Sequence, residues 1–174
     1  DPLPTDYQND MLFLAEVLWS EPWTDHAICK NMIDDDSVPP EYDPITKLYQ
    51  TSGNLSRGTA ISALNDGYSI INHNGHAHYS VLSIGSSGLY RSDFDNLTNG
   101  DRQGIFYSMG CWSAALDYDC IAEHWVNSQG GGVAYIGNSR YGWGSPGSPG
   151  YGTGDVFDRE FFYQLFNEGH DIIG

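Results

Sequence analysis

Apolar runs of strand length alternate along the chain with segments whose apolar residues recur at helical spacing. The spacing distinguishes the two, because a buried strand is continuously apolar over four to eight residues while a helix repeats every three or four. The runs predict strands over residues 11–19, 68–72, 104–109 and 133–136. The helical spacing predicts helices over residues 27–33, 58–66, 116–127 and 155–168.

Residues that favour turns separate these segments. Three prolines predict a loop over residues 38–44, and a run of His, Asn and Gly predicts a turn over residues 73–79. A glycine-rich loop is expected over residues 141–154. Gly67 is placed to end the second helix, and Asp155 is placed to cap the last one.

The order of these elements indicates the fold class. Strands that alternate with helices, and that are apolar throughout, are typical of a parallel sheet covered by helices on both faces. The length of 174 residues suits one domain. We therefore predict a single α/β domain over residues 1–174, with a mainly parallel central sheet between two layers of helices.

Charge excludes one class of partner. The chain has 7 Lys and Arg against 23 Asp and Glu, for a net charge of −16. Because proteins that bind nucleic acid neutralise phosphates with Lys and Arg, we expect no nucleic-acid partner. No apolar run has the length that a membrane-spanning helix needs, so we expect no membrane span.

The predicted strand ends bring chemically active side chains together. In a parallel sheet, sites form at the carboxyl ends of the strands. Glu21 follows the first predicted strand, His76 the second, Cys111 the third and residues 140–143 the fourth. We expect a carboxylate, an imidazole, a thiol and an indole at one edge of the sheet.

A thiol beside an imidazole is the pattern of a cysteine nucleophile. An imidazolium lowers the pKa of a neighbouring thiol and later protonates the leaving amine, and a carboxylate behind it orients the ring. Cys111, His76 and Glu21 (or Glu16) have the residue types for these roles, while Cys29 and Cys120 are the other thiols. The simpler alternative is that Cys111 is an inert core thiol.

Two metal sites are alternatives. His73, His76 and His78 lie within six residues, a spacing at which imidazoles can bind zinc in a metal-dependent hydrolase. The acidic run over residues 34–36 is either a solvated loop or a source of oxygen ligands for calcium.

The segments Asn72-His-Asn-Gly75-His76 and Gly110-Cys111 resemble the gingipain family of cysteine peptidases, which have a caspase-like fold. Further similarity lies in Leu97-Thr98-Asn99, Cys120-Ile-Ala122-Glu123 and the segment from Gly132 to Trp143. The similarity covers most of residues 10–168, and it implies a caspase-like sandwich of the α/β/α type.

The resemblance implies a role for several residues. His76 matches the catalytic His, Cys111 the nucleophile and Glu21 the orienting carboxylate. The backbone N–H groups of Ala77 and Cys111 match the oxyanion hole, and Ala77 stands where the best-known members have Gly. Trp143 matches an aromatic residue that lines the pocket for the substrate residue before the cut. Asp34, Asp35 and Asp36 are the nearest candidates for an acidic residue that selects a basic substrate.

The residues and the resemblance together predict a cysteine endopeptidase that works through a Cys-His dyad and a thioester. We expect a polypeptide substrate with a basic residue before the cut, and no cofactor for the chemistry. The resemblance also implies a structural calcium ion, a secreted or cell-surface location, and a larger parent polypeptide. A transpeptidase of the same fold and a non-catalytic surface or binding domain are the alternatives, beside the zinc hydrolase.

Overall fold

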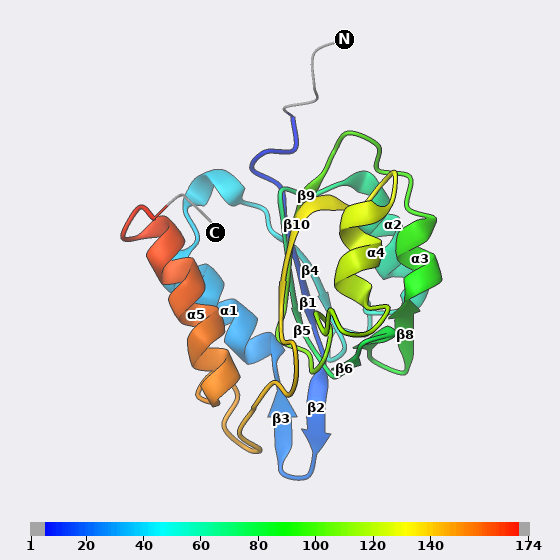
Figure 1. The fold of residues 1–174 in the computed structure, drawn as a ribbon. Coiled ribbons are helices and arrows are strands. Elements are labelled where there is room, and N and C mark those ends of the chain that lie inside the picture. The colour runs from blue at the N-terminus through cyan, green and yellow to red at the C-terminus, as the bar shows by residue number, and fades with distance from the viewer. Residues whose placement is uncertain (1–5, 171–174) are drawn as a thin grey trace.

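A five-stranded sheet runs through the middle of the structure, a computed structural model that describes residues 6–170 (Figure 1). Its strands lie in the order β10-β9-β5-β1-β4, and all neighbouring strands are parallel. The strands are β1 Met11–Ala15, β4 Thr46–Tyr49, β5 Ile70–Asn74, β9 Gly104–Ser108 and β10 Gly132–Gly137. The predicted parallel sheet is confirmed, with β4 as a strand that the sequence pattern missed.

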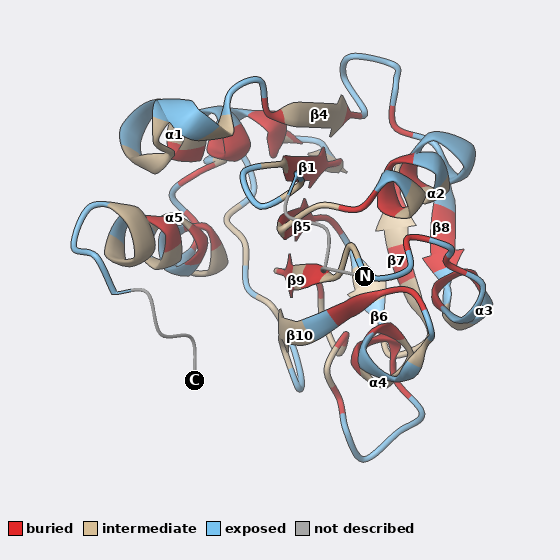
Figure 2. Ribbon diagram, turned by 90° about the horizontal axis from the view of Figure 1, so that it is seen from above, coloured by how far each residue is buried: buried red, intermediate tan, exposed pale blue. Residues whose placement is uncertain are grey.

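Helices cover both faces of this sheet. Seen from above, α1 and α5 lie on one side of it, and α2, α3 and α4 lie on the other (Figure 2). The helices are α1 Ala27–Ser37, α2 Arg57–Asp66, α3 Arg91–Asp95, α4 Ile121–Asn127 and α5 Thr153–Phe166. The three layers confirm the predicted α/β/α sandwich.

Two hydrophobic cores follow from the alternation of side chains along the central strands. Leu12 and Leu14 of β1 pack toward α2 and α4, with Trp125. Met11, Phe13 and Ala15 of the same strand belong to the core under α1 and α5. Because successive side chains of a strand point to opposite faces, a strand between two helical layers is buried on both sides. All five residues of β1 and of β5 are buried accordingly.

Small strands outside the main sheet account for most of the differences from the predicted elements. They are β2 Val17–Ser20 paired with β3 Trp23–Asp25, and the antiparallel set β6 Ala77–His78, β7 Val81–Ile84 and β8 Ser87–Tyr90. A short 3-10 helix, η1 Pro40–Tyr42, lies in the predicted proline loop. The single strand predicted over residues 11–19 is wrong, because β1 ends at Ala15 and the chain continues into the β2–β3 hairpin.

Helix boundaries differ for local reasons. The helix predicted over residues 116–127 begins only at Ile121, where the carboxylate of Glu123 accepts from the backbone N–H of Cys120 at 3.0 Å. Such a reciprocal cap fixes a helix start. The helix predicted over residues 27–33 continues to Ser37. The acidic run over residues 34–36 is therefore helical and not a loop.

A buried ion pair joins the layers. The ammonium of Lys30 on α1 lies 2.6 Å from the carboxylate of Asp158 on α5, and both side chains are 0% exposed. Asn72 of β5 accepts from Lys30 and donates to Asp158, the latter at 2.9 Å. A buried charge is tolerated only with such partners. The network therefore fixes α1 and α5 against the central strand.

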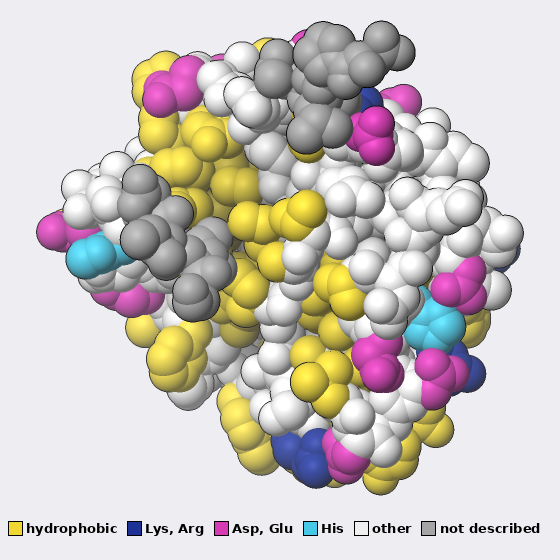
Figure 3. All heavy atoms as spheres, turned by 45° about the horizontal axis from the view of Figure 1, so that its top comes forward, with side chains coloured by type: hydrophobic (Ala, Val, Ile, Leu, Met, Phe, Trp, Pro, Cys, Tyr) yellow, Lys and Arg dark blue, Asp and Glu magenta, His cyan; other side chains and the backbone are white. Residues whose placement is uncertain are grey.

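Acidic side chains dominate the charged surface. On the face in Figure 3, Lys and Arg side chains are few and lie among acidic ones. Within residues 6–170, none of the helices has the length and apolar character needed to cross a bilayer.

Candidate functional site

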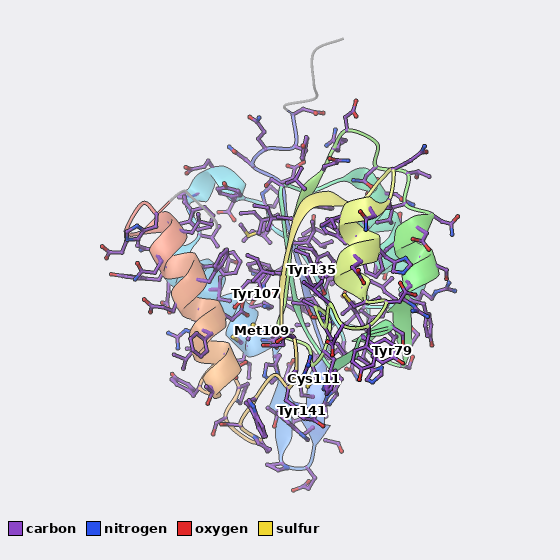
Figure 4. The ribbon with its side chains drawn as sticks, viewed as in Figure 1. Tyr79, Tyr107, Met109, Cys111, Tyr135 and Tyr141 are labelled. Carbon is purple, nitrogen blue, oxygen red and sulfur yellow. The ribbon has the colours of Figure 1, made fainter. Side chains whose placement is uncertain are left out.

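The carboxyl ends of the parallel strands meet at the edge of the sheet next to the β2–β3 hairpin (Figure 1). His76 follows β5 and Cys111 follows β9, so neighbouring strands deliver both residues to this edge. Figure 4 places Cys111 here, between Met109 and Tyr141. Both His76 and Cys111 line one cavity of about 320 Å³. The structure thus brings together the predicted imidazole and thiol.

The turns that carry these two residues touch. A Cβ atom placed on Gly110 would lie 2.3 Å from the Cβ of Ala77 and 3.1 Å from the carbonyl oxygen of Gly75. Real Cβ atoms do not approach so closely, so a glycine is required before Cys111 for the two turns to meet. The contact brings together the turns that carry the thiol and the imidazole.

The ring of His76 is held from one side. Its Nε2 atom lies 2.9 Å from the carbonyl oxygen of Leu18, which can only accept, so Nε2 carries the proton. The edge of the ring also packs against Trp19, with the ring centroids 6.1 Å apart. This arrangement leaves Nδ1 as the ring nitrogen that carries a lone pair and can take up a proton.

A buried carboxylate fixes the backbone of the same turn. Glu16, at the end of β1, accepts from the N–H of His76 at 2.9 Å, from the hydroxyl of Ser83 at 2.7 Å and from the N–H of Gly85 at 2.6 Å. Burial raises the pKa of Glu16, and these hydrogen bonds oppose the shift. Glu16 is therefore the carboxylate that contacts His76 in the structure.

Glu21 lies elsewhere. It is exposed, in the turn between β2 and β3, and none of the hydrogen bonds of residues 6–170 joins it to His76. Its predicted position at the sheet edge rested on a first strand that reached residue 19. Since β1 ends at Ala15, the hairpin carries Glu21 to its tip.

The thiol of Cys111 contacts the loop that follows β10. Its sulfur accepts from the N–H of Gly142 at 3.4 Å and lies 3.6 Å from the carbonyl oxygen of the same residue. The next residue, Trp112, has a φ of 59°, and its N–H donates to the carbonyl of Arg140 at 2.6 Å. A non-glycine residue in this region is uncommon and marks a backbone held by its surroundings. The conformation around Cys111 is therefore imposed by the neighbouring loop.

The backbone donors predicted for an oxyanion lie in these same turns. The N–H of Cys111 makes no hydrogen bond to any residue in the described range 6–170. Ala77 is the first residue of β6, opposite Leu82 of β7. The contact between Ala77 and Gly110 places the two donors on facing turns.

The other two cysteines are core residues. Cys29 and Cys120 are buried, and burial raises the pKa of both thiols. A raised pKa suppresses the reactive thiolate. Cys111 is the more accessible of the three thiols.

The predicted pocket residues divide into two groups. Trp143 lines the cavity with Cys111 and is 69% exposed. Asp34, Asp35 and Asp36 do not line it. They occupy the last turn of α1, whose first turn is the one beside the cavity, and a helix of this length puts about 15 Å between its ends. Asp34 pairs with Lys47 and Asp36 with Arg159.

The histidine cluster is not arranged as a metal site. Burial lowers the pKa of His73 to about 4, and its two nitrogens lie 2.9 Å from the hydroxyl of Ser108 and 2.8 Å from the carbonyl of Ser83. Over residues 6–170, no group of three or more His, Cys, Asp or Glu side chains is placed to hold a metal ion. The zinc alternative therefore has no ligand set among the described residues.

Three residues at the base of the cavity were not anticipated as site residues. His26, Asn74 and Asp155 line it, and His26 Nε2 lies 3.0 Å from Asp155 Oδ1. In the sequence, Asp155 predicted only a helix cap, and its carboxylate does accept from the N–H of Gly152 at 3.1 Å. No sequence pattern marks His26 as a site residue, because it precedes a helix and no motif surrounds it.

The chain was compared with known families. The model of peptidase family C25 matches residues 2–174. No curated protein matches the sequence significantly.

Solved structures resemble the fold. The crystal structure of the Arg-specific cysteine proteinase gingipain R has a TM-score of 0.69 at 19% identity, covering 95% of this chain and 38% of that one. The complex of RgpB pro- and mature domains from Porphyromonas gingivalis has a TM-score of 0.62 at 21% identity, covering 80% of this chain and 34% of that one. A structure described only as a protease has a TM-score of 0.62 at 22% identity, covering 79% and 30%. The chain thus spans about a third of the solved chains that it matches.

Proposed function

The chain belongs to peptidase family C25, the gingipain family of cysteine peptidases, and from this premise we propose that it cleaves peptide bonds with Cys111 as the nucleophile. The observation that carries the proposal is the contact between the Ala77 and Gly110 turns, which puts His76 and Cys111 on one cavity. The substrate is a polypeptide, and the chemistry needs only side chains and backbone groups of this chain.

In the proposed reaction, the Cys111 thiolate attacks the scissile carbonyl carbon and forms a carbon–sulfur bond. The N–H groups of Cys111 and Ala77 face the oxygen on which negative charge develops. When the carbon–nitrogen bond breaks, His76 protonates the leaving amine, and a thioester remains. His76 then takes a proton from water, which attacks the thioester and releases the acid product and the free thiol.

Two groups position the imidazole in this mechanism. The carbonyl of Leu18 holds the Nε2 proton, so that Nδ1 faces the chemistry. Glu16 binds the N–H of His76 and fixes the turn, in the role that the sequence offered to Glu21. Glu16 is a positioning residue here, because it contacts the backbone of His76 and not the reacting atoms.

Two further expectations follow from family membership as proposals. We propose that the chain acts outside the cell, and that it works as part of a longer polypeptide. A basic residue before the cut is a third expectation, and family membership is its remaining support, because Asp34, Asp35 and Asp36 lie at the far end of α1 from the cavity.

The first test is alkylation of the intact protein by iodoacetamide from about pH 5 to about pH 9, with mass mapping of each cysteine. We expect Cys111 to react fast below pH 7, well ahead of the buried Cys29 and Cys120, and the variant His76→Ala to lose this advantage. Labelling of Cys111 at the rate of an ordinary thiol of pKa about 8.5 would overturn the dyad and favour a non-catalytic binding domain.

The second test is cleavage of a mixed peptide library, with Cys111→Ala as the inactive control. Masses of the products separate two reactions of the same thioester. Water gives a free acid, whereas transfer to an added amine gives an amide and would assign the chain as a transpeptidase.

A further inference from the structure

A chain of buried hydrogen bonds joins the turn that carries His76 to the turn that carries Cys111. Its central member is His73, a residue of β5 that is 0% exposed and takes no part in the proposed reaction. His73 lies opposite Ser108 of β9 in the register of the two parallel strands. Because paired residues of neighbouring strands point to the same face of a sheet, these two side chains meet.

One side of the His73 ring is tied to the His76 turn. The Nε2 atom of His73 lies 2.8 Å from the carbonyl oxygen of Ser83. The N–H of Ser83 donates to the carbonyl of His76 at 2.8 Å. The hydroxyl of Ser83 donates to Glu16, which also accepts from the N–H of His76. Ser83 therefore links the imidazole ring of His73 to the backbone on both sides of His76.

The other side of the ring is tied to the Cys111 turn. The Nδ1 atom of His73 lies 2.9 Å from the hydroxyl oxygen of Ser108. That oxygen accepts from the N–H of Gly110, the residue before Cys111, at 3.1 Å. The Ser108 hydroxyl therefore orients the peptide group that leads into Gly110.

The donors and acceptors of these hydrogen bonds fit together in one way while His73 is neutral. The carbonyl of Ser83 only accepts, so Nε2 of His73 carries the proton and Nδ1 keeps its lone pair. The N–H of Gly110 only donates, so the Ser108 hydroxyl accepts from it and gives its own proton to Nδ1. Burial lowers the pKa of His73 to about 4, so the ring is neutral at higher pH.

We propose that His73 is a positioning residue, whose ring keeps the two turns of the Cys-His dyad in place relative to one another. His73 does not line the cavity of Cys111, so it acts through the serines on its two sides. The fit around the ring is close, because a Cβ atom placed on Gly75 would lie 2.5 Å from His73 Nε2. The proposal rests on the proposed peptidase activity.

A buried histidine that serves stability alone makes different predictions. Removing such a ring lowers the free energy of unfolding and leaves the chemistry of the folded protein unchanged. Removing a positioning residue changes the thiol–imidazole pair in the folded protein. Its signature is the loss of fast Cys111 labelling below pH 7, together with a lower kcat at a similar KM.

The test compares two variants with wild type and a control. His73→Phe keeps a ring and removes both of its hydrogen bonds, and Ser108→Ala removes only a hydroxyl. Ser69→Ala is the matched control, because its hydroxyl donates to the carbonyl of Asp10 at 2.9 Å, at the opposite end of β5. Each protein is labelled with iodoacetamide from about pH 5 to about pH 9, and kcat and KM are measured with a peptide that wild type cleaves.

In both variants, with folding checked by thermal unfolding, we expect kcat to fall about tenfold or more while KM changes little. The labelling of Cys111 below pH 7 should slow by a similar factor, and Ser69→Ala should match wild type in both measurements. His73 is neutral over this pH range, so the change reports the dyad and not the titration of His73. Should His73→Phe fail to fold, Ser108→Ala decides the matter.

The outcomes separate this inference from the peptidase proposal. Folded variants that keep the wild-type labelling profile and kcat overturn the positioning role and leave the peptidase intact. An ordinary iodoacetamide rate at Cys111 in wild type itself, with no peptide cleaved, overturns both.

Discussion

Substituting Gly110 by alanine is predicted to force apart the two turns that form the site. The new Cβ would lie 2.3 Å from the Cβ of Ala77, with the carbonyl oxygen of Gly75 at 3.1 Å and the hydroxyl of Ser108 at 3.2 Å. Unlike Gly150, with a φ of 85°, Gly110 does not occupy the left-handed region, so alanine meets a steric obstacle and not a backbone one.

The size of the effect follows from this distance. Two carbon atoms in contact prefer about 3.5–4.0 Å, so the turns must separate by roughly 1.5 Å. Overpacking of this kind costs about 1–3 kcal/mol in the free energy of unfolding. For a chain of this size, that lowers the midpoint of thermal unfolding by roughly 2–4 °C per kcal/mol. A displacement of about 1 Å between reacting groups costs about a hundredfold in rate, and we expect that loss in kcat/KM.

The assay pairs peptide cleavage with thermal unfolding in four proteins: wild type, Gly110→Ala, Ala77→Gly and the double variant. Removing the Cβ of Ala77 relieves the shortest contact, so the double variant should recover much of the activity that Gly110→Ala loses. Gly58→Ala is the control, because a Cβ there meets no atom within 4 Å.

Two results would refute the reasoning. Wild-type kcat/KM in Gly110→Ala would show that the contact between the turns does not set the geometry of the site. Losses that simply add in the double variant would show that Ala77 and Gly110 do not interact.

Three further predictions concern buried and paired charges. Glu16→Gln should lower the free energy of unfolding by about 1–3 kcal/mol, because one carboxylate oxygen is replaced by an amide group that donates. Burial raises the pKa of Glu16, so wild type loses stability as the pH rises above 4.5. Urea titrations should therefore show a smaller difference between wild type and variant at higher pH. Lys30→Met should lower the free energy of unfolding by about 3–5 kcal/mol, because it leaves the buried Asp158 without its cation. Adding Asp158→Leu should restore most of this stability in a urea denaturation series. A double variant as unstable as Lys30→Met would contradict the pairing. Two aspartates raise the pKa of His124, so its stabilising effect is present below pH 6.5 and lost at higher pH, and His124→Gln should lower the unfolding midpoint only on the acidic side.

The layers, and the position of His76 and Cys111 at one edge of the sheet, could be predicted because they depend on local patterns. The apolar runs of β5 and β9 are buried on both sides, and such runs identify central strands wherever the chain carries them. Once the strands were in parallel order, His76 and Cys111 had to share an edge. That part of the site needed no knowledge of side-chain packing.

Glu21 and the acidic run over residues 34–36 lie away from the cavity because their positions depend on where elements end. Glu16 follows β1, and its buried carboxylate accepts from three donors that lie far along the chain. The apolar residues after it resemble a continuation of the strand, although they form a hairpin. His26 and Asp155 were missed for a related reason, since their pairing across 129 positions leaves no trace in local sequence.

The position of β5 between β1 and β9 also bears on how the chain folds. Met11 pairs with Ile70 and Ile70 with Ile105, so the strands that join at the site are separated by 59 and 35 residues. Parallel pairings over such distances form slowly, because long loops must close before any contact compensates for the lost entropy. The thiol therefore meets its imidazole only when β9 docks on a sheet that already holds β5. In a chain that is emerging during synthesis, or that is partly unfolded, the thiol of Cys111 and the imidazole of His76 are apart.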